Sequence, residues 1–207
     1  MGKIYTFNNK IVTLNNKWCE EYVEPVDPYN PLGLPANTVR VRTNNGNVPV
    51  KGNASYETAT LVSGTSDVYD VYKSGQSFQN LLYGSTNIIE VLGANTTNVT
   101  DMGYMFQDCS SLSTVPLFDT SSVTSMYQMF TSCSSLTNIP LFDTSKVTSM
   151  DYMLYNCKSV QSGALALYQQ ASSQANPPSY HSRTFSNCGS NTTTGAAELA
   201  QIPSDWK

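Results

Sequence analysis

Charged side chains are scarce in this sequence of 207 residues, since Asp, Glu, Lys and Arg together make up only 13%. A soluble domain usually carries about 25%. The formal net charge is −4, and Lys and Arg form no run. Because binding to a phosphate backbone needs clustered cations, nucleic acid is excluded as an expected partner.

Long apolar segments are missing as well. No stretch approaches the ~20 apolar residues that a membrane-spanning helix needs, so we expect no membrane span. The first residues, from Met1 to Asn9, lack the apolar centre of a secretory signal peptide. We therefore expect the sequence to carry no export signal of its own.

The usual motifs of catalysis and metal binding are also absent. The five cysteines form no C-x-x-C pair, and neither a phosphate loop nor H-E-x-x-H occurs. His181 is the single histidine, and no G-x-S-x-G motif accompanies it. We therefore expect no enzyme activity, no cofactor and no metal. A hydrolase that uses His181 is the catalytic alternative to a histidine in a surface loop.

Amides and hydroxyls are abundant instead: Asn 19, Ser 26 and Thr 22 sum to 67 of the 207 residues. Much of this bias belongs to an internal repeat. Residues 98–121 read NVTDMGYMFQDCSSLSTVPLFDTS, residues 122–145 read SVTSMYQMFTSCSSLTNIPLFDTS, and the two agree at 15 of 24 positions. A repeat of this length predicts units that stack to bury a shared apolar core.

Two spacings inside the unit predict its structure. Leu112, Val115 and Leu117 have the L-x-x-L-x-L spacing of a leucine-rich repeat, in which a short strand turns these residues inward. Met-x-x-Met-Phe-x-x-Cys places apolar residues at i, i+3, i+4 and i+7, which is typical of a helix. The predicted fold is an α/β repeat, a leucine-rich-repeat solenoid of short parallel strands and short helices with a 24-residue period.

The pattern V-T-x-M-x-x-M-F-x-x-C-x-x-L-x-x-[VI]-P-L-F-D-T-S resembles the BspA-like leucine-rich repeats of bacterial, protist and phage surface proteins. The likeness is specific over residues 98–160 and weaker over residues 68–97 and 161–207. The resemblance implies a non-enzymatic scaffold for adhesion or display, without a cofactor. It says nothing about the first 38 residues.

Five regions are expected along the chain. Residues 1–23 would form an anchor, built on a β-hairpin of residues 4–7 and 10–14. Residues 24–37 are a Pro-rich linker, and residues 38–67 a β cap with strands at 38–42 and 48–50. The repeats occupy residues 68–160, and residues 161–207 contain a degenerate last repeat and a helical cap with helices at 164–171 and 196–200. The side chains expected to anchor the chain to a particle are Tyr5, Phe7, Ile11, Leu14 and Trp18.

Two repeated polar positions each allow two interpretations. Cys109, Cys133 and Cys157 are spaced by 24 residues, which predicts a column of buried thiols, with a metal or disulfide device as the alternative. Asp119 and Asp143 predict turns in which the carboxylate accepts backbone N–H groups, with a Ca²⁺ site as the alternative.

Binding residues are expected on the outer face of the repeats. If Leu117 points inward, alternation turns the residues on either side of it outward. Phe118 and Phe142, which follow the leucine in the two copies, would then form an apolar row on the surface. Alternatively, both fold inward at the turn and belong to the core. The predicted binding residues are Thr114, Pro116, Phe118, Asn138, Pro140 and Phe142, together with Tyr127 and Tyr152, because tyrosine is frequent in recognition surfaces.

The expected function is that of a virion structural or decoration protein, of a gut bacteriophage, that displays the repeats for attachment to a host or surface. The N-terminal segment would bind other virion proteins, and the repeats a bacterial surface protein or glycan. The alternative is a bacterial cell-surface adhesin. The expected location is the virion surface, or the bacterial cell surface in the alternative, and homo-oligomerisation stays open.

Overall fold

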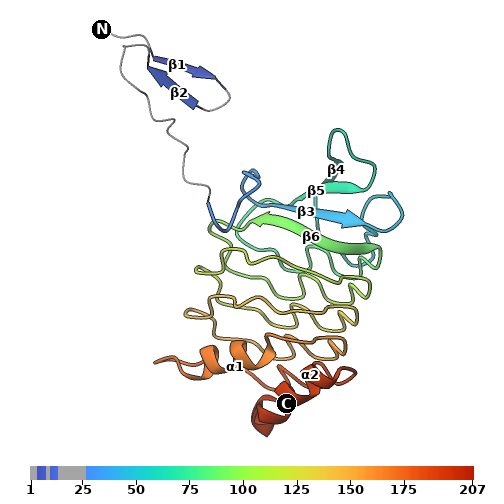
Figure 1. Cartoon of the computed structure of the whole chain (residues 1–207), viewed down its shortest axis with the longest axis vertical. Coiled ribbons are helices and arrows are strands. Elements are labelled where there is room, and N and C mark those ends of the chain that lie inside the picture. Colours follow the sequence, from blue (N-terminus) through green and yellow to red (C-terminus); the bar gives the residue numbers. More distant parts are fainter. Residues whose placement is uncertain (1–3, 8–9, 14–26) are drawn as a thin grey trace.

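The computed structural model describes residues 4–7, 10–13 and 27–207. At the N-terminus, β1 (Ile4–Phe7) pairs antiparallel with β2 (Lys10–Thr13), and Phe7 lies opposite Lys10. This two-strand arrangement (Figure 1) confirms the predicted hairpin.

A four-stranded antiparallel sheet follows, in the order β4-β5-β3-β6. Its strands are β3 (Thr38–Thr43), β4 (Thr58–Leu61), β5 (Val68–Tyr72) and β6 (Ile88–Asn95). Alternation places Val39 and Val41 in the core, while Arg40 between them forms an ion pair with Asp70 on β5. The strand expected over residues 38–42 is confirmed. Residues 48–50, by contrast, form no strand.

The predicted leucine-rich-repeat solenoid is wrong. The strands that pair into a sheet are antiparallel, and residues 98–160 contain neither a strand nor a helix. Where successive copies of the repeat meet, strand-like pairing is limited to isolated parallel bridges of single residue pairs, such as Asp101 with Ser125. The short parallel strand and the short helix expected in each copy are both absent from this part of the chain.

Turns take the place of the predicted helix. In each 24-residue copy, which we call a repeat layer, two residues four positions apart have left-handed backbone angles: Tyr104 and Asp108 in one layer, Gln128 and Ser132 in the next. A helix cannot continue through left-handed residues, so the chain makes successive turns closed by N–H to C=O bonds three residues apart, such as Met105 to Met102. Apolar residues at i, i+3, i+4 and i+7 are compatible with both structures.

Backbone hydrogen bonds also join each repeat layer to the next. The N–H groups of Met102, Tyr104 and Phe106 donate to the carbonyls of Ser125, Tyr127 and Met129 at 2.9, 2.8 and 2.9 Å. The stacked turns appear as the green to orange part of Figure 1. Groups that a loop would leave to water are thus satisfied by the neighbouring layer.

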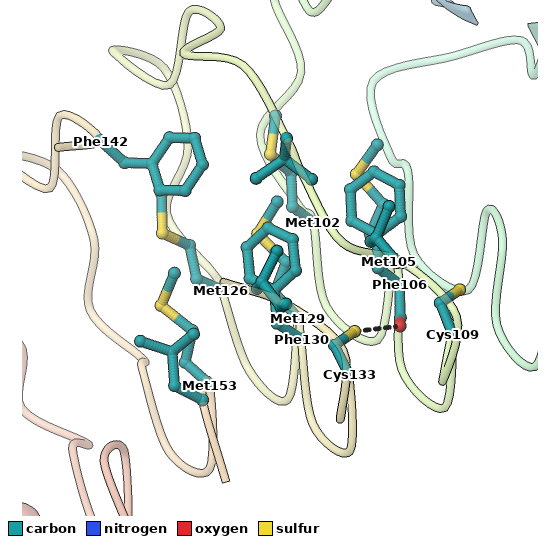
Figure 2. Packing of buried hydrophobic residues seen from close by; sticks show 14 of the residues in the cluster. Met102, Met105, Phe106, Cys109, Met126, Met129, Phe130, Cys133, Phe142 and Met153 are labelled. Carbon is teal, nitrogen blue, oxygen red and sulfur yellow. Dashed lines mark hydrogen bonds between the residues drawn. The ribbon is translucent and has the colours of Figure 1, made fainter. Parts of the chain in front are cut away.

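The core runs through these layers as columns of identical residues (Figure 2). The rings of Phe106 and Phe130 stack with centroids 5.3 Å apart and planes 7° apart. The weaker upstream copy keeps the same register, because its Phe78, Leu81 and Ile88 are fully buried. The repeat register predicted from the sequence is therefore confirmed.

The C-terminal part closes the core. A last copy of the turns, at residues 180–188, pairs with residues 149–156 through bonds such as Leu154 N–H to Thr184 O at 2.8 Å. It is accompanied by α1 (Ala164–Ser172), α2 (Thr193–Gln201) and the short 3-10 helix Ser204–Trp206. Both predicted helices are confirmed. Within the described residues, no helix combines the length and apolar character that a membrane crossing demands.

Candidate functional site

A cleft of about 310 Å³ lies along the stacked layers. Its floor is formed by Leu117 and Leu141, which occupy the same position in two successive layers. The side chains that decide its chemistry are Tyr29, Leu117, Asp119, Leu141, Asp143 and Gln170, and we call it the leucine cleft. Tyr29 comes from the segment before β3 and Gln170 from α1, which lie at opposite ends of the stack (Figure 1).

The two leucines on the floor are unusually exposed for their type, at 42% for Leu117 and 52% for Leu141. They belong to a column that continues in both directions at intervals of 24 residues. Upstream the position is Gly93, where the side chain of Leu32 comes within 2.9 Å of the site of a Cβ. Downstream it is Leu165, which packs partly buried against the core. The column is therefore covered at both ends and open in the middle.

Two carboxylates line the cleft, one from each layer. Asp119 Oδ1 accepts the N–H of Ser121 at 2.9 Å, and Asp143 Oδ1 accepts that of Ser145 at 2.8 Å. This confirms the predicted turn interpretation, and the described residues contain no cluster of metal-ligating side chains. Neither aspartate belongs to the ion pairs found in the described part of the chain, which join Arg40 or Arg42 to other carboxylates.

Gln170 contributes an unused acceptor. Its Oε1 atom is buried and has no hydrogen-bond partner among the described residues. A buried amide carbonyl without a partner is unfavourable by ~1–3 kcal/mol. The cleft thus combines two leucines and two carboxylates, which only accept, with hydroxyl and amide groups, which can both donate and accept.

Phe118 and Phe142, which the sequence left as either a surface row or core, are core. Both are fully buried, and their ring centroids lie 5.0 Å apart. The alternation that placed Leu117 inward is wrong at this point. The buried residues Leu112, Val115 and Phe118 recur every third position, so the chain exposes Leu117 instead.

The other residues predicted on this face stay at the surface but do not line the leucine cleft. Thr114 and Asn138 are exposed, and Pro116 and Pro140 are half-buried. Asn138 Oδ1 accepts a bond from the hydroxyl of Ser162 at 2.7 Å. Thr114 and Asn138 are the polar members of this set, Pro116 and Pro140 the apolar ones, and all four remain a predicted contact surface.

Tyr127 and Tyr152 lie half-buried on the turns of two layers. The ring of Tyr127 meets that of Tyr104 edge to face at 5.0 Å, and its hydroxyl accepts a bond from Gln128 Nε2 at 2.7 Å. Tyr152 packs against Tyr155 in the same geometry at 5.6 Å. The tyrosines are thus fixed by one another, and their role in binding stays a prediction.

The cysteine column is structural, as predicted. Cys109, Cys133, Cys157 and Cys188 are buried free thiols, and burial raises the pKa of Cys109 to about 12. Three of them donate to the carbonyl of a residue 27 positions earlier, as Cys133 Sγ does to Phe106 O at 3.0 Å (Figure 2). Such thiols are poor nucleophiles. The fifth cysteine, Cys19, lies outside the described residues.

His181 packs in a structural position. Its ring stacks on Trp206 with centroids 4.2 Å apart and planes 11° apart, and its Nδ1 atom is buried without a hydrogen-bond partner among the described residues. Among the described residues no hydrogen bond joins the His181 imidazole to a hydroxyl or thiol, and the hydroxyl of Thr184 donates instead to the His181 backbone carbonyl at 2.7 Å.

The predicted anchor is described only in part. Tyr5, Phe7 and Ile11 belong to β1 and β2, while Leu14 and Trp18 lie outside the described residues. The described end of the predicted linker, residues 27–37, is folded against the body of the protein. Leu34 is buried there, and its carbonyl accepts a bond from Asn95 Nδ2 at 2.7 Å.

Sequence reasoning missed the leucine cleft itself. It assigned Leu117 and Leu141 to the core, and it gave Tyr29 and Gln170 no role. The three-residue spacing of Leu112, Val115 and Phe118 was the available signal, since it predicts that the residue before the Phe is exposed.

Comparison with known proteins gives one family. Residues 65–188, which are 124 of the 207 residues, match the family described as "Mycoplasma protein of unknown function, DUF285". Neither the curated proteins nor the solved structures contain a significant match.

Proposed function

We propose that this chain, which belongs to the DUF285 family, is a non-enzymatic attachment protein whose stacked repeat layers display the leucine cleft to a partner. The observation that carries the proposal is the pair of exposed leucines at the floor of a concave site. Contiguous exposed apolar surface is uncommon on soluble proteins and marks interaction sites. The family is related to the BspA-like repeats, whose members are surface proteins, and this supports display outside the cell.

The construction of the cleft suits binding better than chemistry. Leu117 and Leu141 each precede a fully buried Phe of the core, and the lining also includes Tyr29 and Gln170, which are far apart in sequence. Such a site is held in place before a partner arrives, so little ordering entropy is lost on binding.

For location, we propose the virion surface, with residues 1–23 attaching the chain to other virion proteins. The bacterial cell surface is the second candidate, and the naming of Mycoplasma in the family description favours it. Mass spectrometry of purified virions and surface labelling of cells that make the protein separate the two. Recovery of the chain only from the cell surface would overturn the virion proposal.

Attachment is tested with the fluorescently labelled full-length protein on whole bacteria. The double substitution Leu117→Ser and Leu141→Ser is expected to reduce adhesion at least about tenfold, because it removes the apolar floor. Leu61→Ser is the matched control, since Leu61 is equally exposed, at 47%, on β4. Equal adhesion of the double variant and the wild type would refute a role for the cleft.

A further inference from the structure

The geometry points to an arginine side chain flanked by apolar residues, on a partner protein, as the group that the leucine cleft binds. This inference rests on the proposed attachment function and deepens it, because it names the chemistry of the partner. Three features carry it: the open column, the paired carboxylates and the ring of Tyr29.

The exposed part of the leucine column favours contact with an apolar side chain of a partner. At its upstream end the chain already covers the column with one of its own leucines, Leu32, which lies against Gly93. At the downstream end Leu165 is packed against the core. A partner residue that lies on Leu117 and Leu141 would complete the cover in the way that Leu32 does.

The carboxylates of Asp119 and Asp143 favour binding of a planar cation. Asp119 and Asp143 occupy equivalent positions in successive layers, and the hydroxyl of Thr120, next to Asp119, donates to the backbone carbonyl of Asp143 at 2.9 Å. Each uses Oδ1 for its turn, and within residues 27–207 no hydrogen bond reaches either Oδ2. A guanidinium presents several N–H donors in one plane and can meet both carboxylates, whereas an ammonium is a point charge.

The ring of Tyr29, which also lines the cleft, fits the same group. A guanidinium stacks favourably on the face of a tyrosine ring. Arginine supplies the charge, the donors and an apolar stem that can lie along leucine side chains.

The segment before Tyr29 is a poor occupant because it contains no arginine. Residues 1–28 carry three lysines, at positions 3, 10 and 17, and four acidic residues, at positions 20, 21, 24 and 27. A partner that presents an arginine is therefore favoured over the N-terminal part of the same chain.

The test is an NMR titration of the full-length protein with the pentapeptide acetyl-Ala-Leu-Arg-Leu-Ala-amide, followed at the methyl groups of Leu117 and Leu141. Peptides with Lys or Gln in place of Arg are the comparison ligands. We expect shifts at these methyl groups, a Kd for the arginine peptide at least about tenfold below that for the glutamine peptide, and weaker binding at higher ionic strength.

Variants locate the contact. Asp119→Asn and Asp143→Asn are each expected to weaken binding about tenfold, because the amide keeps the turn acceptor but loses the charge. Asp205→Asn changes the net charge equally at an exposed site near the C-terminus and should leave Kd unchanged. Equal binding of the Arg and Gln peptides, equal binding of the Arg and Lys peptides, or wild-type affinity in both aspartate variants would each overturn the inference.

Failure of the arginine inference can be distinguished from failure of the proposed attachment function. If labelled protein adheres to cells through the leucines while no peptide binds, the arginine inference fails and the attachment proposal stands. If the arginine peptide binds as expected while no cell surface is bound, the attachment proposal fails by itself.

Discussion

Leu141 and Phe142 are neighbours in sequence with opposite environments: the side chain of Leu141 is 52% exposed, whereas that of Phe142 is fully buried. The ring of Phe142 lies 5.0 Å from that of Phe118 and 6.1 Å from that of Phe130. The core of the layers thus depends on the residue that follows each exposed leucine.

Truncation of these two neighbours should therefore have very different effects. Phe142→Ala is expected to lower the free energy of unfolding by about 3–5 kcal/mol, because it leaves a cavity among stacked rings. Leu141→Ala removes a side chain that is half in water and should change it by less than about 0.5–1 kcal/mol. Urea unfolding followed by circular dichroism measures both values. Similar losses for the two variants would contradict the assignment of Phe142 to the core.

A second prediction concerns the hydrogen bond that Cys133 Sγ donates to the backbone carbonyl of Phe106. Cys133→Ala removes the donor and should cost about 1 kcal/mol, while the carbonyl of Phe106 keeps its bond from the N–H of Cys109. Cys133→Ser keeps a donor of similar size and should be the more stable of the two variants. The same urea experiment decides the order, and an alanine variant that equals or exceeds the serine variant would show that the thiol bond contributes nothing.

The buried thiols also predict a loss of stability at high pH. Burial raises the pKa of Cys109 from about 9 to about 12 in the folded chain. Below pH 9 the thiol is protonated in both states and its contribution is complete. Between pH 9 and 12 only the unfolded chain releases the proton, so stability falls by up to about 1.4 kcal/mol per pH unit for this one thiol.

The measurement is the difference between wild type and Cys109→Ala in urea unfolding from pH 8 upward, because the other titrating groups cancel in that difference. The wild type should lose its advantage as the pH rises towards the folded pKa of Cys109. A difference that is constant with pH would argue against a buried, protonated thiol.

Gly163 supplies a test of the chain path just before α1. Its φ is +97°, and an added Cβ would overlap the carbonyl oxygen of Ile139 in the layer above. Gly163→Ala should therefore be strongly destabilising, by more than about 3 kcal/mol, since both the left-handed angle and the contact oppose it. Gly64 has a φ of +81° with open space around it, so Gly64→Ala isolates the backbone part, about 1–2 kcal/mol. Thermal unfolding of the two variants should separate them clearly, and equal melting temperatures would show that the contact with Ile139 is absent.

The sequence predicted the period of the repeat and most of its core. Met102, Phe106 and Cys109 were recognised because a shared position in every copy must serve shared packing, and all three are fully buried. The hairpin of β1 and β2 and the helices α1 and α2 were also predicted, since each depends on residues close together in sequence.

The helix predicted in each repeat was wrong because the same spacing of apolar residues is compatible with a helix and with a series of turns. Met102, Met105, Phe106 and Cys109 fit a helix, but the left-handed angles at Tyr104 and Asp108 that make turns instead carry no strong signal in those residue types. The four-stranded sheet was missed for another reason. β4 has the sequence TATL and is mostly exposed, so its apolar pattern is too weak to predict its pairing with β5.

The leucine cleft was not predicted for a related reason. Whether Leu117 faces water is decided by the three-residue spacing from Leu112 to Phe118, and Tyr29 reaches the site only through the folded segment before β3. Contacts between residues so distant in sequence cannot be read from local patterns.

The thiol column has a consequence for where the protein can work. Cys109, Cys133, Cys157 and Cys188 hold the core together without a covalent link, and each is shielded from solvent. The folded layers therefore need neither an oxidant to form nor a reductant to persist. The same core is compatible with the reducing compartment in which a chain is synthesised and with an oxidising exterior.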